Sequence, residues 1–201
     1  MRMRSIKMLA RELMSHIIYD RLILEHLFLL EQMAHGSLST VRFLGETLDN
    51  SKEFDYLQSE AEGAVYGFQG IEEGYWDNLQ KLVSDYLIQC ATRTRIMQDF
   101  SDFSTDNPEY CPDEESCRKY PGLATILEGN FHLSLRECCN KIIHAKNVEL
   151  VPLVDKVTNL KYWSGLCVLG GDKSKKSWKL QINIGLWVLA MRYYYSVTSE
   201  L

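Results

Sequence analysis

The sequence has little proline, no long apolar run and no excess of positive charge, and each shortage excludes a class of protein. Only four prolines and 12 glycines occur in 201 residues, which excludes collagen-like and low-complexity chains. The most apolar early stretch, residues 22–30, contains Glu25 and His26 and is far shorter than the roughly 20 residues that cross a bilayer. We therefore predict no membrane partner. The formal net charge of −5 argues against a domain dedicated to coating nucleic acid, but it allows a small local site.

Several motifs that define enzyme classes are also missing. The sequence has no glycine-rich phosphate loop, no dinucleotide-binding fingerprint, no H-E-x-x-H and no G-x-S-x-G. These absences exclude the usual ATPase, dehydrogenase, zinc-protease and α/β-hydrolase interpretations, and we predict no cofactor. The first 20 residues lack the continuous apolar segment of a secretory signal, so the predicted location is the cytoplasm.

The six cysteines are accordingly predicted to be reduced thiols. Cys111 and Cys117 form a C-x5-C pair, whereas zinc sites more often use C-x2-C or C-x4-C and need four ligands. The sequence around this pair contains no histidine that would complete such a set. We predict no metal site and favour two free loop thiols over a disulfide.

The chain is 46% hydrophobic and long enough to bury a core without disulfides, and we predict a single domain over residues 1–201. The hydrophobic periodicity predicts a mainly helical α+β fold with about five helices in all: a helical bundle over 1–146, a small antiparallel sheet over 147–184, and a closing helix over 185–197. The sheet is expected to be a β-hairpin or a three-stranded meander. Helices are predicted at 4–19, 20–48, 71–99, 123–146 and 185–197, strands at 148–153, 162–169 and 178–184, and irregular segments at 49–70 and 100–121.

The predicted helix around residue 140 carries a polar stripe. At about 100° per residue, Arg136, Asn140 and His144 occupy neighbouring positions in successive turns, while Phe131, Leu135, Cys138, Ile142 and Ala145 form the core side. Arginine can bind a phosphate through two hydrogen bonds, and histidine can act as general acid or base near neutral pH. The stripe therefore suggests a metal-independent ribonuclease site, in which Asn140 orients one of the other two. An ordinary solvent-exposed helix surface is the competing interpretation.

This helix resembles the motif helix of the HEPN superfamily, in which four to six residues lie between an arginine, often followed by a polar residue, and a histidine. Here Arg136 and Glu137 match the first pair and His144 matches the histidine, with seven residues between Arg136 and His144. The resemblance covers about 15 residues and implies a helical bundle, an RNA substrate and a homodimer that acts as a ribonuclease in defence or toxin systems. On a single helix the two side chains would lie roughly 12 Å apart along the axis, so a second copy across a two-fold axis is expected to complete the site.

A second group of charged residues lies near the predicted turn at 170–177. Lys173, Lys175, Lys176 and Lys179 are candidate contacts for the RNA phosphate backbone, although a solvated turn also explains them. RNA is thus one predicted partner. The alternative function is a non-catalytic interaction or accessory module that binds a protein partner, which the acidic charge and the unusual Arg–His spacing favour.

Overall fold

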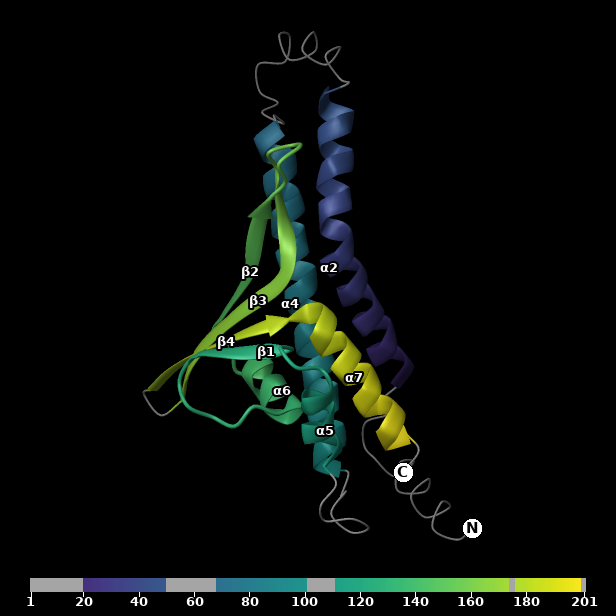
Figure 1. Cartoon of the computed structure of the whole chain (residues 1–201), viewed down its shortest axis with the longest axis vertical. Coiled ribbons are helices and arrows are strands. Elements are labelled where there is room, and N and C mark those ends of the chain that lie inside the picture. Colours follow the sequence, from purple (N-terminus) through teal and green to yellow (C-terminus); the bar gives the residue numbers. More distant parts are fainter. Residues whose placement is uncertain (1–19, 50–67, 101–110, 174–175, 200–201) are drawn as a thin grey trace.

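The computed structural model describes residues 20–49, 68–100, 111–173 and 176–199, which form an α+β fold of five helices and one four-stranded antiparallel sheet. The long helices α2 (Asp20–Asp49) and α4 (Phe68–Phe100) lie beside each other, and α7 (Ile184–Ser199) packs against α2. Figure 1 shows these three helices next to the sheet, with the short helices α5 (Pro112–Lys119) and α6 (Leu135–Ile143) near its lower end. No described helix is long and apolar enough to cross a membrane.

The sheet has the strand order β1-β4-β3-β2. The predicted antiparallel sheet, a β-hairpin or a three-stranded meander, is confirmed. The meander is the form that occurs: β2 (Asn147–Val154), β3 (Lys161–Lys173) and β4 (Lys176–Asn183) pair with their neighbours in antiparallel register. Alternate residues of β3 and β4 are buried, as the period-two pattern predicts. One core joins the sheet to the helices through Trp163 and Ile182 from the strands, Val83 from α4 and Trp187 from α7.

The helix predicted over 123–146 is wrong in its first half. Ala124–Glu128 forms β1, which pairs with β4 and adds a fourth strand to the sheet. Tertiary hydrogen bonding to β4 outweighs the local helical pattern here. The helix begins only after Ser134, whose side-chain oxygen accepts a hydrogen bond of 3.1 Å from the Glu137 backbone N–H. The sequence Ser134-x-x-Glu137 is a capping-box pattern that marks this start.

The irregular segment predicted over 100–121 is also partly wrong, because Pro112–Lys119 is helical. Its composition explains the helix. Proline occupies the first turn, where its missing N–H has no partner to lose, and acidic residues at 113–115 lie at the positive end of the helix dipole. Arg118 and Lys119 lie in the last turn, where positive charge is favourable.

Other predicted helices agree with the structure in the described residues. The helix predicted over 20–48 is α2, which continues through Gly36 and Gly45, and the helix predicted over 71–99 is α4. The closing helix predicted over 185–197 is α7. The helix predicted over 4–19, most of the irregular segment predicted over 49–70, and Lys175 lie outside the described residues.

Candidate functional site

The side chains of α6 divide among three environments. Leu135, Cys138 and Ile142 are buried in the core, as the helical pattern predicts, and Cys139 is buried beside them. Phe131 and Ala145 lie just outside the helix and are partly buried against the same core. The polar residues of α6 face either α4 and α5 or the β3–β4 hairpin, so the helix connects two polar regions.

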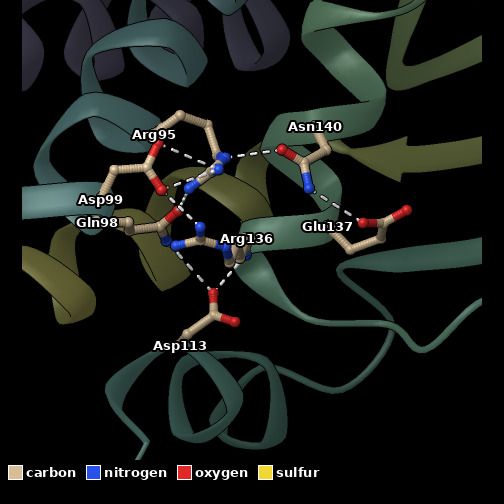
Figure 2. Close-up of polar contacts among 7 residues, drawn as sticks. All are labelled: Arg95, Gln98, Asp99, Asp113, Arg136, Glu137 and Asn140. Carbon is tan, nitrogen blue, oxygen red and sulfur yellow. Dashed lines mark hydrogen bonds and ion pairs between the residues drawn. The ribbon is translucent and has the colours of Figure 1, made fainter. Parts of the chain in front are cut away.

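The first polar region is a network in which Arg136 and Asn140 contact α4 and α5 (Figure 2). The Arg136 guanidinium donates to Asp99 over 2.5 Å, and its backbone N–H donates to Asp113. Arg95 Nε donates to the Asn140 side-chain oxygen over 2.7 Å. Arg95 also contacts Asp99 at 3.1 Å, so one carboxylate receives both guanidinium groups. The network joins three consecutive helices through residues that are 23 to 45 positions apart in the sequence.

The two carboxylates of this network have opposite electrostatics. Burial disfavours the charged form of Asp99, but its hydrogen bond with Arg136 and the charges of Arg95 and Arg136 outweigh burial and lower its pKa. Asp113 is more deeply enclosed, and burial raises its pKa despite hydrogen bonds from Ser134 and the Arg136 backbone. The network thus favours the anionic form of Asp99 and disfavours the anionic form of Asp113.

His144 lies apart from the other two stripe residues. It is the C-cap of α6; its backbone N–H donates to the Asn140 carbonyl over 3.0 Å, and its side chain is exposed. Within the described part of the chain, no side-chain hydrogen bond or ion pair joins its imidazole to Arg136 or Asn140. The structure therefore brings Arg136 and Asn140 into one network and leaves the imidazole outside it. Their ribonuclease roles remain predictions.

The second polar region is a pocket of about 490 Å³ between α6 and the β3–β4 hairpin. Two of the predicted phosphate contacts, Lys173 and Lys176, line it. Lys179 is not among the lining residues, and its ammonium lies 4.0 Å from the Glu128 carboxylate. The pocket is lined by Gly129, Asn130, Phe131, Glu137, Lys141, Lys173, Lys176, Ser177 and Trp178.

Lys141 is the pocket residue that the sequence analysis missed. Only 5% of it is exposed, and its ammonium lies 4.0 Å from the centre of the Phe131 ring and 4.3 Å from the centre of the Trp178 ring. The Glu137 carboxylate is 3.5 Å away. Cation–π attraction and an opposite charge therefore hold a lysine that would otherwise be costly to bury. The i,i+4 spacing of Glu137 and Lys141 is visible in the sequence, but the two aromatic partners are not.

Two glycines shape the wall that faces Lys141. A Cβ on Gly171 would lie 2.4 Å from Cζ2 of Trp178, so the indole occupies the space that a side chain there would fill. Gly129 has φ +98°, and a Cβ there would lie 3.2 Å from the Trp178 Cβ. These glycines allow Trp178 to lie flat against the hairpin and the β1–α6 loop. In this way an apolar wall forms beside three lysines.

The remaining candidate residues have other surroundings. Cys111 is exposed and Cys117 is partly buried, and both are free thiols. Within the described residues, no three cysteine, histidine, aspartate or glutamate side chains are grouped as metal ligands.

The chain was compared with protein families, curated proteins and solved structures, and no match was found in any of the three comparisons.

Proposed function

We propose that this chain is an RNA-associated protein that binds single-stranded RNA at the pocket between α6 and the β3–β4 hairpin. The observation that carries the proposal is the meeting of Lys173 and Lys176 with Lys141 and two aromatic rings in one pocket. Lysine neutralises phosphate, and exposed bases associate with aromatic and cationic groups. An acidic protein can bind RNA in this way because the positive charge is local.

The proposal extends to metal-independent cleavage with His144 as general acid or base. Helical geometry supports it, because Glu137, Lys141 and His144 follow one another at spacings of four and three residues along the same side of the helix. The rise from Lys141 to His144 is about 4.5 Å along the helix axis. A strand held by Lys173 and Lys176 would bring a 2′-hydroxyl toward the exposed imidazole.

In this proposal, Arg136 and Asn140 hold α6 against α4, and a homodimer gives Arg136 a second role. The Arg136 side chain is 42% exposed, so a phosphate presented near a second copy of α6 could replace Asp99 as its partner. A phosphate contact of Arg136 in a homodimer agrees with the HEPN-like mechanism that the sequence resemblance implies. Light scattering of the purified chain measures whether the homodimer forms.

The first test separates binding from cleavage. We expect Lys173→Ala with Lys176→Ala to weaken single-stranded RNA binding, whereas Lys81→Ala with Lys156→Ala, which removes the same charge elsewhere, has a smaller effect. We expect RNA cleavage in EDTA to be lost in His144→Ala from an identical preparation. Equal cleavage by the wild type and His144→Ala would exclude the catalytic role. Equal binding by the two lysine variants would exclude the pocket.

A second candidate function is a non-catalytic interaction module, and exposed apolar residues of α2 favour it. Leu24 is 45% exposed and Phe28 is 50% exposed, and the two lie one turn apart. Exposed apolar groups that are contiguous often mark protein interfaces. This candidate predicts that Phe28→Asp changes the oligomeric state in light scattering and leaves RNA binding unchanged, with Leu82→Asp on α4 as the matched control.

A further inference from the structure

The floor of the pocket places a hydrogen-bond donor beside an acceptor. Lys141 Nζ and Glu137 Oε1 are 3.5 Å apart, and both side chains line the pocket. Neither is free to move widely. The rings of Phe131 and Trp178 enclose the ammonium, and the other Glu137 oxygen accepts a hydrogen bond of 3.1 Å from Asn140. The pocket therefore presents a preorganised pair of opposite hydrogen-bonding character.

This preorganisation comes from the network on the other side of α6. Asn140 donates to Glu137 while its oxygen accepts from Arg95, whose side chain is only 16% exposed. The Asn140 amide is thereby held in one orientation, with its nitrogen toward Glu137. A carboxylate fixed in this way retains further lone pairs for a ligand, because an ionised carboxylate accepts about four hydrogen bonds.

The donor of Lys141 and the acceptor of Glu137 match one single-stranded base better than the others. The Watson–Crick edge of guanine carries an acceptor, O6, next to two donors, N1–H and the N2 amino group. Lysine donates to O6, and a carboxylate accepts from both donors. Adenine, cytosine and uracil each offer only one donor group on this edge, so each leaves part of the carboxylate without a partner. Guanine is therefore the base that satisfies both Lys141 and Glu137.

Charge and size agree with a nucleotide. Three lysines and one glutamate line the pocket, which leaves it positive and suited to a phosphate near Lys173 and Lys176. Its volume of about 490 Å³ lies within the range of roughly 300–1,000 Å³ that is usual for small-molecule sites. The aromatic rings at the wall supply the apolar contact that a flat base needs.

We propose that the pocket recognises an unpaired guanine nucleotide of single-stranded RNA, with Glu137 and Lys141 reading its Watson–Crick edge. This inference rests on the proposed RNA association and names the nucleotide that the pocket selects. It gives Glu137 the role of a specificity-determining residue. Duplex RNA is excluded as the ligand because pairing hides that edge.

The test measures the affinity of fluorescent RNA hexamers by anisotropy at constant salt. The reference is an all-uridine hexamer, and the others carry one guanosine, inosine or adenosine at the same central position. We expect guanosine to bind about 5- to 150-fold more tightly than adenosine, which corresponds to the roughly 1–3 kcal/mol of one good base contact. Inosine, which lacks only the N2 amino group, should lie between them.

The matched protein variants are Glu137→Gln in the pocket and Glu73→Gln in α4. We expect Glu137→Gln to reduce the guanosine-to-adenosine ratio toward one and Glu73→Gln to preserve it. Equal affinity of the wild type for guanosine, inosine and adenosine hexamers would overturn the guanine inference while leaving RNA association intact. Failure of every hexamer to bind would overturn both. The inosine comparison uses unaltered protein, so it is informative even if Glu137→Gln fails to fold.

Discussion

The two polar sides of α6 differ in what they face: two helices on one side and a pocket on the other. Toward α4 and α5, Arg136 and Asn140 contact Asp99, Asp113 and Arg95. Toward the hairpin, Glu137 and Lys141 contact each other and line an open pocket. The sequence makes the first side look functional, because an arginine, an asparagine and a histidine follow one another in successive turns. The structure shows that the same stripe also has a structural role.

A polar stripe on a helix is informative about function only together with the groups that its residues contact. Buried or half-buried polar groups must be paired, and a neighbouring helix can supply the pairs as well as a ligand can. Here the neighbour is α4 for one side of α6, and the β3–β4 hairpin with the β1–α6 loop for the other. The following variants test this division, beginning with the largest expected effect on stability.

The largest effect should come from the aromatic wall of the pocket. Trp178 is 4% exposed and lies against Gly171 and Gly129, so Trp178→Ala should lower the free energy of unfolding by about 3–5 kcal/mol. Urea denaturation measures this change. Trp178→Phe retains an aromatic ring and should cost clearly less. Equal losses in the two variants would show that the volume of the indole is unimportant there.

The network between α4 and α6 should give the next largest effect. Arg95→Met removes the hydrogen bond to Asn140 and leaves the amide oxygen without that partner, which should cost about 1–3 kcal/mol in urea denaturation. Arg118→Met is the control, because Arg118 pairs with Glu115 in an exposed position and should cost about 0–1 kcal/mol. In Arg95→Met, the free energy of RNA binding should change by less than the free energy of unfolding. A larger loss of unfolding free energy in Arg118→Met than in Arg95→Met would contradict the structural role of Arg95.

The two carboxylates of the network should respond to acid in opposite directions. The pKa of Asp99 is lowered, so its stabilisation is present above the ordinary value of 3.8 and is lost as the pH falls through its folded-state pKa. The pKa of Asp113 is raised, so its contribution is full below 3.8 and is lost as the pH rises through its folded-state pKa.

Denaturation of the two asparagine variants across the acid range separates these contributions. Relative to the wild type, Asp99→Asn should lose less stability on acidification, and Asp113→Asn should lose more. The change in each variant is expected between the ordinary pKa of 3.8 and the folded-state pKa of its carboxyl group. Identical pH profiles for the two variants would show that the carboxylates are equivalent.

The smallest effect on stability should come from the rim of the pocket. Lys173 and Lys176 are exposed, so replacing each with alanine should change the free energy of unfolding by at most about 0.5 kcal/mol. The same variants should weaken RNA binding, and the loss should shrink as salt rises, because the release of counterions by phosphate contacts is less favourable at high salt. A large loss of stability here would place these lysines with the structural residues instead.

Local patterns in the sequence predict much of the fold. Alternation over residues 178–184 predicts β4, and the apolar spacing over 20–48 and 71–99 predicts α2 and α4. These elements are long or strongly periodic. The start of α6 was predictable from the capping box at Ser134 and Glu137, and α5 from its proline and its charge order. The strand at Ala124–Glu128 was not, because its pairing with β4 is its main cause.

The fold class and the three C-terminal strands could be predicted from the sequence. Local propensity and burial periodicity fix these features, and both are written in neighbouring residues. Only the tertiary structure decided which polar residues are paired with each other and which face a pocket. Arg95 and Asn140 are 45 positions apart, and Lys141 meets Trp178 across the hairpin. Hydrogen bonds and cation–π contacts act over a few ångströms in space, so their partners depend on how distant segments pack.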